Sequence, residues 1–291
     1  MKVFATRPLP GPAWTELLDV SIGSVDDAYA EIEVLIVANE MVDGRALDRL
    51  PALRLIANFG VGYDRIDVAA CRARGVAVTN TPGVLDAATA DVTFALMLAA
   101  RRRIVEGDQL VRAGRWASHW SAGPFLGREV NGATLGIVGL GRIGSAVMKR
   151  AVGFDMRVLS VTRREGNLDE LLRASDIVTL HVPLTSETAG LLSRERLALL
   201  RDGATLVNTA RGAIIDMAAL VDELVSGRIT AGLDVFVDEP NVPNELLSLP
   251  NVVLTPHIAS STVETRAEMT RVVVDNVLAL ERGAPLLTPV Q

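Results

Sequence analysis

The sequence predicts an α/β protein built from two doubly wound parallel-sheet domains, and three observations support this fold class. The chain has 291 residues, enough for two domains of about 100–200 residues each. Short runs of Val, Ile and Leu recur along it, and they are apolar throughout instead of alternating, which is typical of parallel strands covered on both faces. Helical patterns separate many of these runs, and strands that alternate with helices indicate a parallel sheet.

The predicted strands form two groups along the chain. The first group comprises residues 34–38, 54–57 and 76–79. The second group comprises residues 134–138, 157–161, 176–180, 205–208, 229–233 and 251–254. Helical patterns within the second group cover residues 143–151, 168–174, 194–200 and 216–226. The second group therefore alternates between strand and helix, as a doubly wound sheet does.

Two longer helices are predicted on either side of the second group, over residues 89–110 and 262–282. The later one opens with Ser261-Thr262-Val263-Glu264, which fits a capping box. If both helices pass between domains, residues 1–90 and 266–291 form one discontinuous domain. Residues 91–265 then form a second domain that is inserted into the first.

Composition and charge exclude several classes of protein. The chain has 29 Lys and Arg against 35 Asp and Glu, a net charge of −6, so no basic surface for nucleic acid is predicted. No apolar run reaches the roughly 20 residues of a membrane-spanning helix, and the N-terminus lacks a signal-peptide pattern. The single cysteine, Cys71, has no partner for an intrachain disulfide. We expect a cytoplasmic protein without a membrane partner, in which Arg101-Arg102-Arg103 is a solvated helix end.

A glycine-rich motif marks a candidate dinucleotide site. Gly139-Leu140-Gly141-Arg142-Ile143-Gly144 matches G-x-G-x-x-G, follows a predicted strand and opens a predicted helix. In this motif Gly139 permits a tight turn, Gly141 lets the backbone approach a pyrophosphate, and Gly144 lets the helix pack closely. The backbone of Arg142 and Ile143 then lies at the positive end of the helix, which attracts phosphate. A plain glycine turn is the alternative interpretation.

Several further motifs occur in a fixed order along almost the whole chain. They are Asn58-Phe59-Gly60-Val61-Gly62-Tyr63-Asp64, the loop from Gly139 to Gly144, His181-Val182-Pro183-Leu184-Thr185, Asn208-Thr209-Ala210-Arg211-Gly212, Asp234-Val235-Phe236-Val237-Asp238-Glu239-Pro240 and Pro256-His257-Ile258-Ala259-Ser260. With them the chain resembles the D-isomer-specific 2-hydroxyacid dehydrogenases, closest to the glyoxylate/hydroxypyruvate reductase branch. The resemblance implies a Rossmann-type NAD(P)-binding domain inserted into a flavodoxin-like substrate-binding domain.

The resemblance implies a catalytic trio of Arg211, Glu239 and His257. Reduction of a ketone by hydride needs a proton donor, and histidine is the usual group near neutral pH. His257 takes that role by resemblance, and Glu239 pairs with it to keep it protonated. The planar fork of Arg211 suits the substrate carboxylate. The alternatives are a surface salt bridge for Arg211 and Glu239 and a loop histidine bonded to backbone for His257.

The resemblance also implies the remaining contacts. The backbone N–H groups of Val61 and Gly62 hold the substrate carboxylate, as a backbone nest can; a simple turn is the alternative. Six further residues in the inserted domain are expected to bind the cofactor: His181, Pro183, Thr209, Ala210, Asp234 and Ala259. A packed loop position is the alternative for His181. No Cys and His cluster has metal-ligand spacing, so no metal is expected.

Residues after the second strand of the inserted domain indicate which cofactor is preferred. An NAD-specific fingerprint places Asp or Glu about 20 residues beyond the glycines, where it binds the ribose 2′-hydroxyl. Here that place is taken by Thr162, followed by Arg163 and Arg164. A hydroxyl can hydrogen-bond the 2′-phosphate of NADP and an arginine can neutralise it. We therefore expect NADP(H) to be preferred, with NAD(H) possible, unless both arginines are solvated loop charges.

The leading interpretation is an oxidoreductase that converts small 2-keto acids, glyoxylate or hydroxypyruvate first, to D-2-hydroxy acids. A nucleotide-sensing, corepressor-like binding protein is one alternative, and a dehydrogenase of formate, phosphite or an aryl pyruvate is another. A homodimer built mainly through the inserted domain is expected by resemblance, with Trp116 or Trp120 at the interface or over the neighbouring subunit's pocket. Only residues 165–167 join the second strand of this domain to the next helix, a shorter connection than the family usually has.

Overall fold

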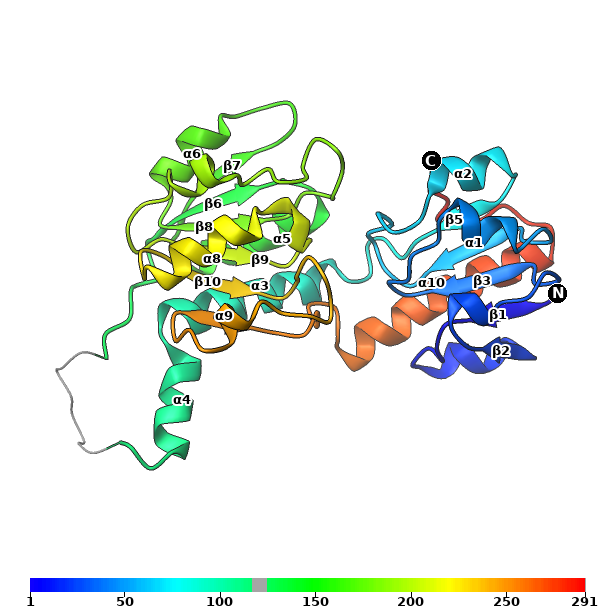
Figure 1. Ribbon diagram of the computed structural model, residues 1–291, viewed down its shortest axis with the longest axis horizontal. Helices are drawn as coiled ribbons and strands as arrows, with labels where there is room; N and C mark the ends of the chain where they lie inside the picture. Colours follow the sequence, from blue (N-terminus) through cyan, green and yellow to red (C-terminus); the bar gives the residue numbers. More distant parts are fainter. Residues whose placement is uncertain (117–124, 291) are drawn as a thin grey trace. The chain divides into compact units, whose positions relative to one another are not determined.

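The computed structural model describes residues 1–116 and 125–290 and divides the chain into two compact units. The first unit comprises Met1–Asp86 and Ser260–Gln291, and the second comprises Ala87–Ala259. The second unit is therefore inserted into the first along the chain (Figure 1). The predicted ranges place both boundaries a few residues further along the chain.

The first unit is built on a five-stranded, all-parallel sheet in the order β2-β1-β3-β4-β5. This is the flavodoxin-like order of doubly wound sheets. Its strands are β1 (Val3–Ala5), β2 (Val20–Ile22), β3 (Val34–Val37), β4 (Leu55–Asn58) and β5 (Ala77–Thr79). Its helices are α1 (Gly44–Asp48), α2 (Val68–Ala73) and α10 (Val263–Glu281), with two short 3₁₀ helices, η1 (Pro12–Glu16) and η2 (Val25–Asp27).

Both faces of this sheet are buried. Leu35, Val37 and Ile56 pack with residues of α1 and α2 in one apolar cluster. The long helix α10 contacts β4, and six residues from Met269 to Val277 are buried on it. The single cysteine, Cys71, lies in the first cluster, and burial raises the pKa of its thiol to about 11. It is therefore a packing residue with little thiolate character.

The second unit is built on a six-stranded, all-parallel sheet in the order β11-β10-β9-β8-β6-β7. Its strands are β6 (Thr134–Val138), β7 (Arg157–Val161), β8 (Ile177–Leu180), β9 (Thr205–Asn208), β10 (Thr230–Leu233) and β11 (Val252–Leu254). Its helices are α3 (Asp86–Arg101), α4 (Ile104–Arg112), α5 (Arg142–Ala151), α6 (Leu168–Ala174), α7 (Arg194–Leu197), α8 (Met217–Val225) and α9 (Asn244–Leu247), with 3₁₀ helices η3 (Val152–Phe154) and η4 (Gly212–Ile214).

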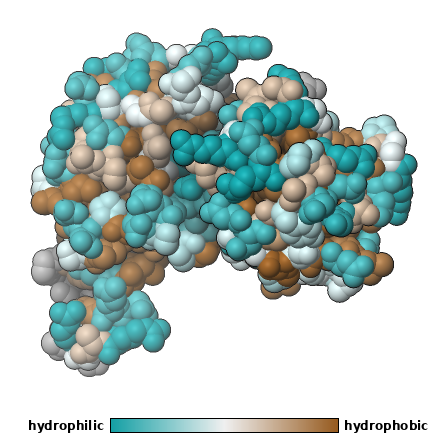
Figure 2. Space-filling model, turned by 45° about the vertical axis from the view of Figure 1, so that its right-hand side comes forward, coloured by the Kyte–Doolittle hydropathy of each residue, from teal (hydrophilic) through white to brown (hydrophobic). Residues whose placement is uncertain are grey.

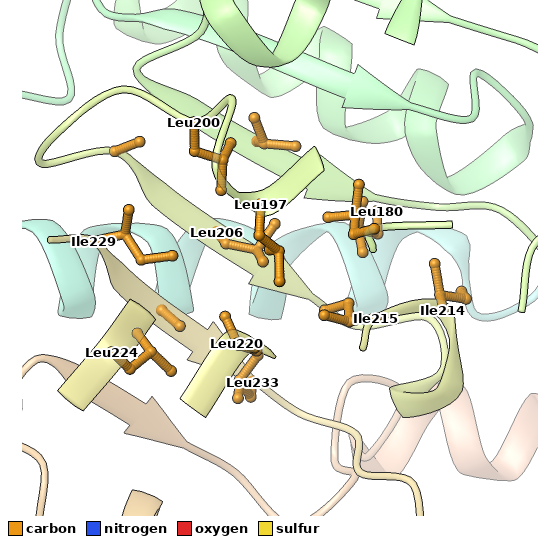
Figure 3. Close-up of a cluster of buried hydrophobic side chains, with 14 of the residues drawn as sticks. Leu180, Leu197, Leu200, Leu206, Ile214, Ile215, Leu220, Leu224, Ile229 and Leu233 are labelled. Carbon is orange, nitrogen blue, oxygen red and sulfur yellow. The ribbon is translucent and has the colours of Figure 1, made fainter. Parts of the chain in front are cut away.

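Neighbouring residues of several strands in the second unit enter two different apolar clusters. On β9, Leu206 packs with residues of α6, α7 and α8, whereas its neighbour Val207 packs with residues of α3 and α5. Figure 3 shows the first of these clusters, in which Leu180, Leu206 and Leu233 of the strands meet the helices. Burial on both faces explains why the strand sequences are continuously apolar. The predicted fold class is confirmed.

The structure corrects four details of the sequence prediction. The strands β1 and β2, of three residues each, were not predicted. The helix predicted over residues 89–110 is two helices, since Arg103 has a left-handed φ of 53° between α3 and α4. The last helix is capped by Thr262, which accepts from the N–H of Thr265, so Ser261 is not its cap.

The fourth correction concerns Arg101, which is not part of a solvated helix end. Its residue is only 7% exposed, and its guanidinium donates to the carbonyl oxygens of Glu129 and Asp176 at 2.9 and 3.0 Å. Arg101 therefore links α3 to the segments that precede β6 and β8 of the six-stranded sheet. Within the described residues, no helix is long and apolar enough to span a bilayer.

Candidate active site

Most of the predicted site residues lie along one edge of the six-stranded sheet. In a parallel sheet the carboxyl ends of all strands meet at the same edge, and ligands bind there. Thr162 follows β7, Gly139 follows β6 and His181 follows β8. Further along the same edge, Arg211 follows β9, Glu239 follows β10 and His257 follows β11. The point where the strand order reverses lies between β6 and β8, beside the glycine-rich loop.

The surroundings of the three glycines show which of these positions could carry a side chain. Gly139 has a φ of 97°, and a Cβ there would lie 2.6 Å from the carbonyl oxygen of His181. A Cβ on Gly144 would lie 2.1 Å from the carbonyl oxygen of Gly139. A Cβ on Gly141 would meet nothing within 4 Å, although this residue caps the ten-residue helix α5. The space beside Gly141 and the helix N-terminus together fit a bound pyrophosphate.

The turn after β7 carries the residues predicted to select the cofactor. The Thr162 hydroxyl accepts hydrogen bonds from the backbone N–H groups of Arg164 and Glu165 at 3.3 and 3.2 Å. Arg163 is exposed and forms an ion pair with Glu187, with 2.7 Å between nitrogen and oxygen. Arg164 is exposed as well. The turn thus presents a hydroxyl and two arginines at the edge strand of the sheet.

His181 lies directly beside the glycine-rich loop. Its backbone N–H donates to the carbonyl oxygen of Val138 at 2.7 Å, and its ring atom Nε2 lies 2.9 Å from the Thr179 hydroxyl. Desolvation lowers the pKa of His181 to about 4, because burial disfavours the charged imidazolium. The ring is therefore neutral at neutral pH. Two residues on, the carbonyl oxygen of Pro183 accepts a hydrogen bond from Thr188.

The low pKa of His181 predicts how stability depends on pH. Because the pKa is about 4 in the folded state and about 6.5 in the unfolded chain, the unfolded state binds more protons between these values. The free energy of unfolding should therefore be unaffected by His181 above about pH 6.5. Toward pH 4 it should fall by at most about 3 kcal/mol. The loss should be smaller than this bound, because part of the residue reaches solvent.

The test is urea unfolding of wild type and His181→Gln at pH 7.5 and 4.5. The variant cannot titrate at this position, so its free energy of unfolding should fall less between the two pH values. The carboxyl groups titrate in both proteins, so their effect cancels when the two changes in free energy of unfolding are compared. An equal loss in both proteins would contradict the assigned protonation of His181.

The loop after β9 holds Arg211 through Asn208. Asn208 is fully buried; its Oδ1 accepts from the Ala210 N–H at 3.0 Å and its Nδ2 donates to the Arg211 carbonyl oxygen at 2.8 Å. The guanidinium of Arg211 donates to the carbonyl oxygen of Ala210 at 2.8 Å. Thr209 is buried, and its hydroxyl lies 3.1 Å from that of Thr93 on α3. The sequence marks Asn208 only as part of a motif, and its capping role was not predicted.

His257 and Glu239 form a hydrogen-bonded pair between the loops after β11 and β10. His257 Nδ1 lies 2.7 Å from Glu239 Oε2, and Glu239 Oε1 accepts from the N–H of Phe236 at 3.0 Å. Burial raises the pKa of Glu239, but the hydrogen bonds from His257 and Phe236 and the charge of Arg211 outweigh it, so the net pKa is lowered. Glu239 is therefore ionised at neutral pH, next to the imidazole.

Asp234 and Ala259 lie beneath the same pair. Asp234 is fully buried and Ala259 is 5% exposed. The Ala259 N–H donates to the Asp234 carboxylate at 2.8 Å. Among the described residues no group of three or more His, Cys, Asp or Glu could hold a metal ion. The predicted residue Trp120 lies outside the described residues.

The loop predicted to hold a substrate carboxylate lies in the first unit, after β4. Asn58 donates to the carbonyl oxygens of Gly60 and Gly62 at 3.0 and 2.9 Å, and Asn80 donates to that of Val61 at 2.9 Å. In a trans peptide the N–H points opposite to the carbonyl of the same plane. The N–H groups of Val61 and Gly62 therefore point away from these two asparagines. Asn80 was not predicted, since its side chain acts from another strand.

Comparisons with known proteins agree with this arrangement. The family described as D-isomer specific 2-hydroxyacid dehydrogenase, NAD binding domain, matches residues 94–259. A glyoxylate reductase of Korarchaeum cryptofilum is 46% identical, over 97% of this chain and 93% of that protein. A crystal structure of a Thermus thermophilus protein is 44% identical, with a TM-score of 0.93 and full coverage of both chains.

A third comparison carries ligands. The structure of an NADPH-dependent glyoxylate/hydroxypyruvate reductase of Sinorhizobium meliloti, in complex with NADP and malonate, is 36% identical to this chain. It covers 99% of this chain and 96% of its own, with a TM-score of 0.89. The similarity therefore extends over both units of the chain.

Proposed function

Because this chain belongs to the family of D-isomer-specific 2-hydroxyacid dehydrogenases, we propose that it reduces glyoxylate and hydroxypyruvate with NADPH. The family and its relatives already make it an NAD(P)-dependent 2-keto acid reductase. The observation that carries the reduction step of this proposal is the His257–Glu239 pair, whose loops follow β11 and β10, next to the loop of Arg211 after β9. The product is a D-2-hydroxy acid wherever the reduced carbon is a stereocentre.

The glycine-rich loop supports cofactor binding by the second unit. Gly139, Gly141 and Gly144, with the N–H groups of Arg142 and Ile143, would hold the pyrophosphate at the start of α5. When bound, the dinucleotide supplies the hydride that reduces the keto carbon. His181, Pro183, Thr209, Ala210, Asp234 and Ala259 are the further residues assigned to this site. Thr209 and Asp234 are buried, so they act on it through the backbone shape of their loops.

The acid in this proposal is His257. Its Nδ1 is bonded to the ionised Glu239, so Nε2 on the opposite side of the ring delivers a proton to the keto oxygen. The negative charge of Glu239 favours the protonated imidazole before the reaction. Arg211 binds the substrate carboxylate through its fork and polarises the keto group. In the first unit, the backbone N–H groups of Val61 and Gly62 are proposed to bind a carboxylate, as a backbone nest can.

The test of the function is a panel of substrates with NADPH. Glyoxylate and hydroxypyruvate should be reduced with a higher kcat/KM than pyruvate or phenylpyruvate. In the opposite direction, formate and phosphite with NADP should give no turnover. A larger kcat/KM for an aryl pyruvate would move the proposal to another substrate. No turnover with any 2-keto acid would favour the corepressor-like alternative, in which the fold binds nucleotide without chemistry.

The preference for NADPH rests on the turn after β7. Thr162→Asp with Arg163→Ala should reverse it, because a carboxylate repels the 2′-phosphate and binds the ribose hydroxyls of NADH. Asp can accept the same two N–H bonds that Thr162 accepts, so the turn is expected to keep its shape. A charged hydrogen bond contributes about 1.5–3 kcal/mol, so the kcat/KM ratio of the two cofactors should change at least about tenfold.

The matched control for this prediction is Glu187→Gln. The exposed Arg163–Glu187 pair contributes about 0–1 kcal/mol, so a phosphate can displace it. Removing the carboxylate should lower KM for NADPH a few-fold and leave KM for NADH unchanged. Wild-type preference for NADH, or equal efficiency with both cofactors, would contradict the assignment of Thr162, Arg163 and Arg164.

A homodimer through the second unit is also part of the proposal. Ile104, Val105 and Val111 of α4 are 40–55% exposed, and Trp116 and Leu126 beyond it are 61% and 72% exposed. Figure 2 shows hydrophobic side chains interspersed with hydrophilic ones over the face in view. Apolar residues gathered on one helix and its flanks are typical of a subunit interface. Sedimentation that shows only a monomer at micromolar concentration would contradict this part.

A further inference from the structure

The backbone of His257 is held in an uncommon conformation. Its φ is 53°, in the left-handed region that a residue with a side chain rarely occupies. Such a conformation is strained and persists only where surrounding contacts hold it. The imidazole must point at the substrate, and the direction in which it leaves the chain depends on this backbone angle. The contacts that hold the residue therefore bear on the reaction.

One buried carboxylate makes most of these contacts. Asp234 Oδ1 accepts from the Thr255 hydroxyl at 2.6 Å and from the Ile258 N–H at 2.8 Å, and Oδ2 accepts from the Ala259 N–H at 2.8 Å. The backbone carbonyl of Asp234 accepts from the N–H of His257 at 2.9 Å. The bonds fall on both sides of His257 in the chain. A fully buried carboxylate with three donors has its charge compensated in place.

The neighbouring strand repeats the arrangement. Asn208 at the end of β9 is also fully buried, and its amide holds the N–H of Ala210 and the carbonyl of Arg211. The N–H of Asp234 donates to the carbonyl oxygen of Asn208 at 3.0 Å. Two adjacent strands thus end in buried polar side chains that are joined through their backbones. Each of them shapes the loop that carries one member of the catalytic pair Arg211 and His257.

We propose that Asp234 is a positioning residue for His257, which it holds through the segment from Thr255 to Ala259, and that Asn208 holds Arg211 in the same way. The inference rests on the proposed function of His257 and adds residues that act through it. It assigns Asp234 a task that its burial and its engaged oxygens support. Misplacement of a catalytic group by about 1 Å costs roughly 10²-fold in rate, so these contacts matter for turnover.

The decisive variants are at Thr255, because its side chain touches the carboxylate and stays within the loop. Thr255→Val removes the hydroxyl at nearly constant volume, and Thr255→Ser keeps it. Thr255→Val should lower kcat several-fold with little change in KM for cofactor or keto acid, and Thr255→Ser should restore kcat. Asp234→Asn places an amide where two backbone N–H groups and a hydroxyl need acceptors, so kcat should fall roughly 10–100-fold.

Asn208→Asp is the matched control on the other loop. It removes the donor to the Arg211 carbonyl, so KM for the keto acid should rise and kcat should change less. The Thr255 and Asp234 variants should mainly lower kcat, whereas Asn208→Asp should mainly raise KM for the keto acid. This difference distinguishes positioning of two separate groups from general loosening of the unit. Thermal unfolding of every variant shows whether the unit still folds as the wild type does.

A readout without substrate or cofactor completes the test. The chain has three histidines, so ¹⁵N labelling of histidine gives a spectrum with few ring signals. The ring-nitrogen resonances of His257 should move in Asp234→Asn and Thr255→Val, and those of His181 should stay in place. In Asn208→Asp the His257 signals should move little.

The outcomes separate this inference from the proposed function. If Thr255→Val retains wild-type kcat and the His257 resonances, while Asp234→Asn raises only KM for the cofactor, Asp234 touches the cofactor and the positioning role is wrong. If the wild type reduces no 2-keto acid, the proposed function fails, and the resonances still decide whether Asp234 holds His257. Movement of the His257 signals with normal kcat in every variant would also overturn the inference.

Discussion

His257→Ala should lower kcat for keto acid reduction about 10²–10⁴-fold, the range for loss of a positioned general acid. Affinity for the cofactor should change little, because the glycine-rich loop that would bind it follows a different strand, β6. The loss should come from the missing proton donor. His257 is bonded to an ionised Glu239 at 2.7 Å, and alanine offers no group that could donate from this place. Stopped-flow and steady-state measurements of cofactor oxidation test the prediction.

Glu239→Gln is the companion variant, and its effect should depend on pH. A carboxylate favours the protonated form of an adjacent imidazole, and a neutral amide does not. The alkaline limb of the reductive pH profile should therefore move toward lower pH. At low pH the variant should approach wild-type kcat. Near-normal turnover of His257→Ala, or a pH profile of Glu239→Gln that matches the wild type, would remove the pair from the mechanism.

The sequence predicts the second sheet better than the first, and packing explains the difference. The strands β6, β7 and β9 have the bounds that their apolar runs predict. β6 and β9 are almost wholly buried, and the partly exposed edge strand β7 still packs three apolar residues against the clusters. In contrast, β2 lies at a sheet edge and is at most half-buried, so its sequence carries little apolar signal. The break at Arg103 was missed because hydrophobic periodicity does not report a left-handed backbone angle.

The candidate site divides in the same way. Residues in glycine-rich or family motifs could be placed, since each motif follows a predicted strand and the carboxyl ends of parallel strands share one edge. The supporting side chains could not. Thr255 reaches Asp234 across 21 positions of sequence, and Asn80 reaches Val61 across 19. Contacts between different loops need the fold before they can be seen.

The short connection after β7 has a structural counterpart. In the described residues β7 is the edge of the six-stranded sheet, and the classic dinucleotide-binding order places one more strand beyond this position. The turn from Thr162 to Asn167 leads directly into α6, whose cap is Asn167. The residues proposed to select NADPH therefore stand at the end of an edge strand.

Arg211→Lys should lower kcat/KM for the keto acid roughly 10²–10³-fold, mostly through KM, although it keeps the charge. A guanidinium has five N–H donors in a planar fork, and an ammonium is a point charge with three. In the structure one of these donors already holds the carbonyl oxygen of Ala210 at 2.8 Å, which fixes the plane of the fork. Lysine cannot keep this bond and also bind a carboxylate through two parallel hydrogen bonds, so the substrate loses both grip and orientation.

Two controls make the expected result for Arg211 specific. Oxamate carries the same carboxylate as the substrate, so it should depend on the same interaction with Arg211. It should therefore inhibit Arg211→Lys much more weakly than the wild type. Added guanidinium should partly restore the activity of Arg211→Ala, because it supplies the planar fork that the side chain no longer provides, and alkylammonium ions should not. If Arg211→Lys kept both kcat and KM within a factor of about two, charge alone would suffice. The carboxylate clamp assigned to Arg211 would then be wrong.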